Sequence, residues 1–114
     1  MEQQQLLKIL VQMNKEIYQL LGSSLEKVVL YGSYARGDFT PDSDVDILIL
    51  TNTTASETQK YKKQLSRILS RLSLEYNIIL SMFLIDKESY IHWLPAMPFY
   101  QNIEKDGIVL YDAA

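Results

Sequence analysis

Residues 28–50 read VVLYGSYARGDFTPDSDVDILIL, and this stretch decides the fold. It opens with a short apolar run (28–31) and closes with a longer one (45–50). The loop between them, from Gly32 to Ser43, is rich in glycine and polar residues. Apolar runs without polar alternation are typical of strands covered on both faces. The stretch therefore predicts two buried strands joined by a polar loop, which has room for a helical turn at its start.

The first half of this loop carries groups suited to phosphate. Gly32 directly follows the first strand, where a glycine lets the backbone turn tightly and approach a ligand without a Cβ. The Ser33 hydroxyl and the amides that follow it can donate to phosphate oxygens. Arg36 adds a planar and permanently charged fork. Gly32, Ser33 and Arg36 are therefore the predicted nucleotide-binding residues.

The loop ends in two acids, Asp44 and Asp46, which flank the first residue of the second strand. Residues two apart in a strand point to the same face of the sheet, so the two carboxylates should lie side by side. Adjacent carboxylates repel each other unless a cation lies between them. Mg²⁺ (or Mn²⁺) takes a few oxygen ligands from the protein and the rest from phosphates and water. Asp44 and Asp46 are thus the predicted metal ligands and catalytic residues.

Each of these features alone is common in turns and calcium loops. Their conjunction, Gly-Ser after a strand and Asp-x-Asp at the start of the next, favours metal-assisted nucleotidyl transfer.

The spacing of apolar residues predicts the remaining elements. Helices are indicated where apolar residues recur every three and four positions, and strands where short apolar runs occur. Gly22 is the expected left-handed cap of the first helix. The order α-β-β-α-β-α-(β) predicts an α/β (α+β) fold in one domain, residues 1–114, with a mixed sheet of three to four strands and helices packed against it. We expect helices over residues 2–21, 56–74, 89–93 and 98–105, and strands over residues 76–85 and 108–111.

Composition restricts the class of protein. The 114 residues carry a net charge of −3, which argues against direct nucleic-acid binding through a basic surface. There is no cysteine, so disulfides, thiolate metal sites and cysteine nucleophiles are excluded. The start of the sequence lacks the pattern of a signal peptide, and no apolar run is long enough for a membrane span. We expect a soluble protein of the cytoplasm.

The segments from Gly32 to Asp38 and from Ser43 to Ile47 resemble the signature of the minimal nucleotidyltransferases, in the DNA polymerase beta-like superfamily. A weaker likeness extends to the tail, residues 98–107. The resemblance implies the nucleotidyltransferase fold, ATP or another nucleoside triphosphate as substrate, and Mg²⁺. It also implies transfer of a nucleoside monophosphate to a hydroxyl acceptor.

The superfamily usually has a third carboxylate on a neighbouring strand, but the expected strand over residues 76–85 contains no acid. By alternation, Asn77 or Ser81 takes the third position, and Glu75 would share that face if the strand began earlier. Neither an amide nor a hydroxyl of this kind is a general base. Two alternatives follow: Glu75 or Asp86 at a strand end completes the enzyme, or nucleotide binding survives with weakened catalysis.

In a sequence of 114 residues we expect no separate domain that recognises the acceptor. Small family members are similar to the antitoxin halves of two-gene modules, in which the transferase adenylylates a HEPN-type toxin. The resemblance therefore implies a protein partner from a neighbouring gene. The alternative is a binding module that neutralises its partner by direct contact, and association of the chain with itself is left open.

Overall fold

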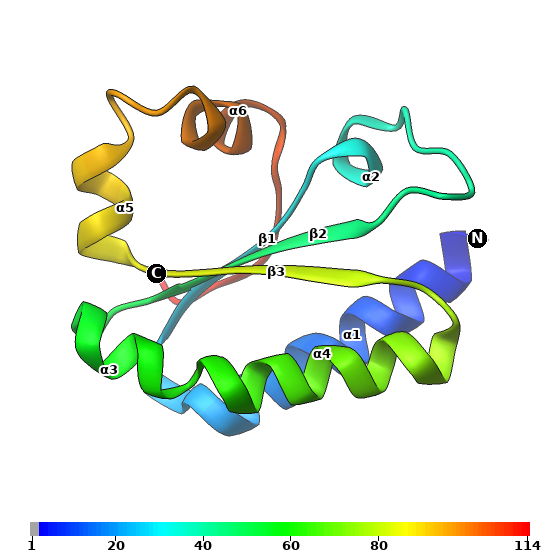
Figure 1. Ribbon diagram of the computed structural model, residues 1–114, viewed down its shortest axis with the longest axis horizontal. Coiled ribbons are helices and arrows are strands. Elements are labelled where there is room, and N and C mark those ends of the chain that lie inside the picture. Colours follow the sequence, from blue (N-terminus) through cyan, green and yellow to red (C-terminus); the bar gives the residue numbers. More distant parts are fainter. Residues whose placement is uncertain (1–2) are drawn as a thin grey trace.

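The computed structural model describes residues 3–114, which form a four-stranded sheet between two layers of helices (Figure 1). Helices α1 and α4 cover one face of the sheet, and α5 and α6 cover the other. None of the helices in the described part of the chain is long and apolar enough to cross a membrane. The elements in chain order are α1 (Gln3–Leu21), the 3₁₀ turn η1 (Gly22–Ser24), β1 (Leu25–Tyr31), α2 (Ser33–Arg36), β2 (Val45–Thr51), α3 (Ala55–Lys60), α4 (Lys62–Tyr76), β3 (Leu80–Asp86), α5 (Lys87–Trp93), α6 (Pro98–Asp106) and β4 (Ile108–Asp112).

The strand order is β3-β2-β1-β4. Strand β1 pairs antiparallel with both β2 and β4, whereas β2 and β3 are parallel because α3 and α4 carry the chain back across the sheet. In this register Asp46 of β2 lies opposite Tyr31 of β1 and opposite Ser81 of β3. The C-terminal end of β1 and the N-terminal ends of β2 and β3 therefore lie together at one end of the sheet, where the loop of residues 32–44 begins and ends.

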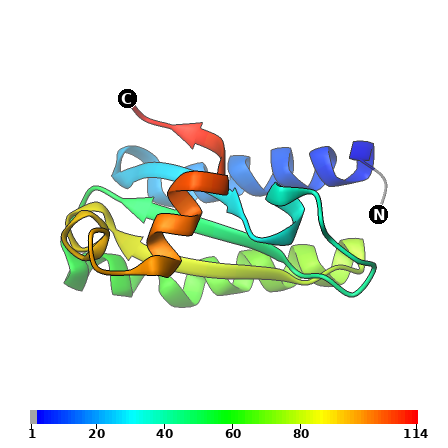
Figure 2. The same cartoon turned by 90° about the horizontal axis from the view of Figure 1, so that it is seen from above.

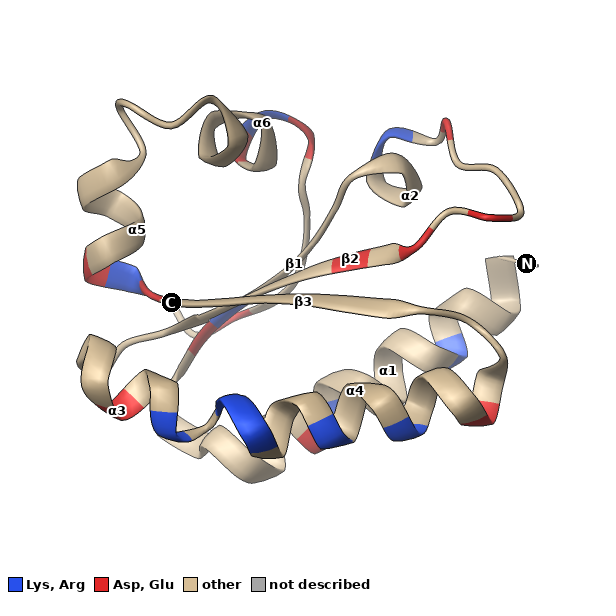
Figure 3. Ribbon diagram, in the orientation of Figure 1, with Lys and Arg blue, Asp and Glu red and all other residues tan. Residues whose placement is uncertain are grey.

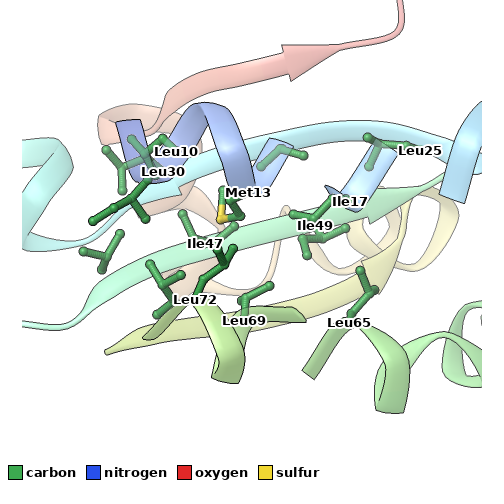
Figure 4. Packing of buried hydrophobic residues seen from close by; sticks show 14 of the residues in the cluster. Leu10, Met13, Ile17, Leu25, Leu30, Ile47, Ile49, Leu65, Leu69 and Leu72 are labelled. Atoms are coloured by element: carbon green, nitrogen blue, oxygen red, sulfur yellow. The ribbon is translucent and has the colours of Figure 1, made fainter. Parts of the chain in front are cut away.

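Both faces of the sheet are covered, which explains the continuous apolar runs in β1 and β2. On one face, α1 and α4 pack Met13, Ile17 and Leu72 against Ile47 and Ile49 (Figure 4). On the other face, the alternate residues Leu48 and Leu50 pack with Tyr90, Tyr100 and Ile103 of α5 and α6. Truncating one of the fully buried aliphatic side chains to alanine typically costs about 2–5 kcal/mol. This core fixes the positions of β1 and β2, whose ends carry the polar loop.

Several of the predicted elements are confirmed. The first helix is present, although its predicted start at residue 2 lies outside the described residues. Both strands of the 28–50 stretch are present, β1 starting earlier at Leu25, and the helical turn at the start of the loop is α2. Gly22 has the expected left-handed conformation, with φ of 54°. The final strand, β4, forms an edge of the sheet next to β1.

The predicted boundaries of the helix and strand between residues 56 and 79 were wrong. The single expected helix is two helices, and the second continues to Tyr76. Asn77 then adopts the left-handed conformation (φ 53°, ψ 48°) as the C-terminal cap of α4, a conformation that asparagine tolerates better than most residues. Strand β3 begins only at Leu80 and runs to Asp86. Asn77 and Glu75 are therefore not on the strand, and of the three tentative positions only Ser81 is.

Candidate functional site

The predicted phosphate-binding half of the site is built around Gly32. Gly32 has φ of 77° and ψ of −155°, a conformation that side-chain-bearing residues rarely adopt, and it caps the N-terminus of α2. Its carbonyl accepts hydrogen bonds from the amides of Ala35 and Arg36, both at 3.1 Å. The first amides of α2 have no partner inside the helix and are open to a ligand. The turn after β1 thus presents Ser33 and its neighbours at the edge of the sheet.

Asp46 lies directly against this turn. A Cβ built on Gly32 would overlap the Asp46 carboxylate oxygen Oδ2, so only a glycine permits the observed approach. Burial raises the pKa of Asp46, the carboxylate of Asp44 raises it further, and Arg36 opposes both effects. The structure therefore brings Gly32, Arg36 and Asp46 together in one pocket, and Asp44 lies two residues before Asp46 in the chain.

Arg36 has one polar partner in the described part of the chain. Its Nε donates to Asp38 Oδ2 at 3.1 Å in an exposed ion pair, which contributes little stability. The terminal nitrogens of its guanidinium make no hydrogen bond within residues 3–114 and remain open to a phosphate. Acidic residues line the loop and the start of β2, whereas five of the eleven basic residues lie along α3 and α4 beyond the sheet (Figure 3).

Two pockets adjoin the aspartate pair. The smaller, of about 360 Å³, holds Gly32, Ser33, Arg36 and Asp46, and α6 closes its other side. The larger, of about 690 Å³, lies by the loop and the α4–β3 connection and includes Asp44 and Asn77. The smaller pocket contains the predicted phosphate-binding residues and one predicted metal ligand, Asp46. Asp44 lines the larger pocket, and Asp46 lines the smaller one.

The structure separates the remaining third-position candidates from the aspartate pair. Glu75 is in the last turn of α4, on the opposite face of the sheet from Asp46, and it pairs with Arg71 at 3.5 Å. Asp86 is five residues along β3 from Ser81, about 16 Å away at the rise of a strand. Its carboxylate caps α5 by accepting a hydrogen bond from the Ser89 amide at 2.9 Å.

No group of three or more acidic, histidine or cysteine side chains within residues 3–114 is arranged to hold a metal ion. Ser81 occupies the strand position beside Asp46, on the same face of the sheet. Asn77 lines the larger pocket from the end of α4 and does not belong to the strand. The alternative in which Glu75 or Asp86 completes the carboxylate set therefore loses its structural basis.

The two aspartates still fit a divalent cation. Their carboxylates supply hard oxygen ligands. Burial first, and the charge of Asp44 second, raise the pKa of Asp46, and a nearby cation would oppose both effects. Mg²⁺ commonly takes only one or two protein carboxylates and completes its shell with phosphate oxygens and water. Asp44 and Asp46 are therefore the residues that would hold the ion.

One part of the pocket was missed by the sequence reasoning. Helix α6 contributes Phe99, Asn102, Ile103 and Asp106; from the sequence this segment was predicted to be helical, with a weak likeness to the family, but was given no place in the site. These four residues stand at positions i, i+3, i+4 and i+7, the spacing of one helix face. That spacing was the available signal, but nothing in the sequence indicated that the helix lies across the strands beside α2 (Figure 2).

Comparison with known proteins agrees with this geometry. The relative MJ0141 of Methanocaldococcus jannaschii, named as a candidate protein adenylyltransferase, is 40% identical over 83 residues, covering 73% of this chain and 82% of the relative. A crystal structure named as a candidate nucleotidyltransferase from Sulfolobus solfataricus superposes with a TM-score of 0.52 at 21% identity, over 96% of this chain and 86% of that one. A toxin–antitoxin structure with AMP-PNP gives a TM-score of 0.50 at 20% identity, over 89% and 73% of the two chains.

At these identities the two solved structures establish the fold alone, and they confirm the predicted mixed-sheet nucleotidyltransferase fold. The sequence pattern that defines the family described as "Nucleotidyltransferase domain" matches residues 5–110. That range contains both halves of the site and the helix that closes it. The chain belongs to the nucleotidyltransferase domain family, as its likeness to the minimal nucleotidyltransferases predicts.

Proposed function

We propose that this protein transfers AMP from ATP to a hydroxyl group on a partner protein. The observation that carries the proposal is the contact between the Asp46 carboxylate and Gly32. It brings one predicted metal ligand, Asp46, into the same pocket as the predicted phosphate-binding groups, so that a triphosphate held by the turn would lie against Asp46. The relationship to MJ0141, which is named as a candidate protein adenylyltransferase, supports a protein as the acceptor.

The residues of the pocket have distinct roles in this proposal. The amides and hydroxyl at Ser33 bind the outer phosphates, and Arg36 balances their charge. Asp44 and Asp46 would hold Mg²⁺, which would supply charge neutralisation at the reacting phosphate. The acceptor oxygen forms a bond to the α-phosphorus as the bond to the β-phosphate breaks, and pyrophosphate leaves. The hydroxyl proton passes to water, because the hydroxyl of Ser81 is not a general base.

The proposed partner is a HEPN-type toxin encoded beside this protein, which would then act as the antitoxin. One of the structures that share the fold is described as a toxin–antitoxin with AMP-PNP, and this supports such a pairing and ATP as the nucleotide.

A second function is favoured by one specific observation. Ser81 stands where a third carboxylate would complete the site, and no three-acid group is present within residues 3–114. In this alternative the pocket binds nucleotide with little turnover, and the protein neutralises its partner by direct contact.

A labelling experiment separates the two functions. The protein is incubated with Mg²⁺, ATP labelled in the α-phosphate, and the product of the neighbouring gene, and label on that product is followed. The same reaction is run with Asp44→Asn/Asp46→Asn. Asp112→Asn is the matched control, because Asp112 is an exposed acid of β4 that lines neither pocket. We expect label with the wild-type protein and Asp112→Asn and none with the double variant.

Label that persists in the double variant would refute the catalytic assignment. If no label appears with any protein, and the wild type and the double variant neutralise the partner equally well, the contact mechanism is correct.

A further inference from the structure

We propose that α6 recognises the base of the bound nucleotide and selects adenine, with Phe99 packing against the ring and Asn102 reading its edge. This inference rests on the proposed function, because it requires the triphosphate to lie between α2 and Asp46. The pocket there has about 360 Å³, within the usual range for small-molecule sites. Once the phosphates occupy the side formed by Ser33 and Arg36, the nucleoside is directed toward the side formed by α6.

The α6 wall of the pocket offers an aromatic surface. The Phe99 ring lies 5.6 Å from Tyr31 at an interplanar angle of 77°, and 5.6 Å from Phe83. These contacts hold the ring in place, yet 46% of Phe99 is exposed, and it lines the pocket. Stacking of a base on an aromatic side chain is favourable for any base, so Phe99 supplies affinity rather than selectivity.

Asn102 follows Phe99 by three residues and lies on the same face of α6. Its side chain lines the pocket, and within residues 3–114 its amide makes no hydrogen bond. An asparagine amide offers one donor and one acceptor side by side, which match the N7 acceptor and the N6 amino donor of adenine. This pairing carries the selectivity in the proposal.

The helix that presents these residues is fastened at both ends. The Gln101 side chain donates to the carbonyls of Leu94 and Pro95 at 3.1 and 3.0 Å, which holds the α5–α6 turn. At the other end Gly107 lies so close to β1 that an added Cβ would be 2.6 Å from Val29 Cγ1. Tyr100 stacks on Tyr90 with ring centroids 5.0 Å apart. Phe99 and Asn102 are therefore held in position before a ligand arrives, which reduces the entropy lost on binding.

Asp106 lies on the same face of α6, one turn beyond Asn102, and is the remaining polar group of that face. It forms no metal-binding group with Asp44 and Asp46 in the described part of the chain. Its carboxylate can accept a hydrogen bond from a ribose hydroxyl. A carboxylate could instead accept hydrogen bonds from the amino and imino groups of guanine, so the experiment must separate adenine from guanine.

The test compares ligands with and without a base. Binding of ATP, GTP and inorganic tripolyphosphate is measured by titration calorimetry in Mg²⁺ for the wild type, Phe99→Ala and Asn102→Ala. We expect Asn102→Ala to weaken ATP at least about fivefold and to remove most of the preference over GTP. Phe99→Ala should weaken ATP and GTP alike by about fivefold or more. Neither change should alter tripolyphosphate binding, whereas Arg36→Ala should weaken all three ligands.

Two matched variants control for indirect effects. Trp93→Ala removes an aromatic side chain of similar exposure (51%) that lines no part of this pocket, and Gln19→Ala removes an exposed amide on α1. Both should bind ATP as the wild type does, and circular dichroism confirms that every variant is folded.

Several outcomes would overturn the inference. Loss of tripolyphosphate binding in Asn102→Ala, or ATP binding unchanged in both α6 variants, would remove α6 from base recognition. A preference for GTP that disappears in Asp106→Asn would assign the base to Asp106 instead. If the wild type binds neither nucleotide nor tripolyphosphate, the proposed function itself fails, and that result is distinct from the others.

Discussion

Replacing Gly32 with alanine should separate backbone strain from damage to the site. The φ of 77° and ψ of −155° lie in a region that is almost exclusive to glycine, and a side chain there costs about 1–3 kcal/mol. The added Cβ would also overlap Asp46 Oδ2, which is the end of a side chain that can rotate away. We therefore expect Gly32→Ala to lower the free energy of unfolding by about 2 kcal/mol, nearly all of it from the backbone.

The overlap of the added Cβ with the Asp46 carboxylate should weaken Mg²⁺–ATP binding rather than lower the stability of the fold. Rotation of Asp46 moves a predicted metal ligand away from the phosphate-binding turn. Charge-assisted contacts of this kind contribute about 1.5–3 kcal/mol each, so Mg²⁺–ATP affinity should fall by about tenfold or more. Stability is measured by urea unfolding and affinity by titration calorimetry.

Gly22→Ala is the matched control, because Gly22 also has a positive φ, of 54°, but has open space around it. It should cost about 1 kcal/mol of stability and leave nucleotide binding unchanged. In an Asp46→Ala background, where the overlap is absent, Gly32→Ala should still cost about 2 kcal/mol. Native stability together with native affinity in Gly32→Ala would refute the reasoning, since both the strain and the overlap would then be without effect.

Three further changes test the electrostatics and the core. Asp46→Asn should raise the free energy of unfolding at pH 7 without ligands, because burial and the neighbouring acid raise the pKa of Asp46 and so disfavour its charged form; unchanged or lower stability in urea would contradict this. Thr58→Val leaves the buried hydroxyl of Thr51, now 2.6 Å from that of Thr58, without its partner and should cost about 1–3 kcal/mol, most of which the additional change Thr51→Val should restore. Burial alone would raise the pKa of Glu16, but the hydrogen bond from Arg71 helps to lower it below its ordinary value of 4.5. The stability that ionised Glu16 contributes is therefore complete above pH 4.5 and is lost as the pH falls further. Glu16→Gln should make the loss of stability in acid less steep, and an unchanged acid side of the stability curve would count against this prediction.

The sequence was sufficient to predict the two strands and the loop at the end of the sheet that carries the candidate site. Apolar runs identified β1 and β2 as buried strands, and the helical turn expected at the start of the loop between them is α2. These features are local, because residues a few positions apart determine the turn, the cap and the strand face. Their chemical roles stay predictions that the labelling and binding experiments address.

Features that depend on tertiary packing were not predictable in the same way. The apolar pair Ile78 and Ile79 suggested an earlier strand, but the left-handed Asn77 ends α4 later, and Ile79 is 61% exposed in the connection. Whether an apolar residue extends a helix or begins a strand depends on its distant neighbours, which single-sequence periodicity does not contain. The same holds for Asn102, whose place beside Asp46 depends on how α6 crosses the sheet.

The parallel register of β2 and β3 also determines how many substitutions would give this site a third carboxylate. Because Ser81 is directly opposite Asp46 on the same face, a carboxylate introduced at position 81 would need no change of backbone. A binding-only or weakly active form and a form with three acids would thus differ by one substitution on the same backbone. Ser81→Asp makes that step accessible in the laboratory, and an increase in transfer rate would measure what the third acid is worth in this fold.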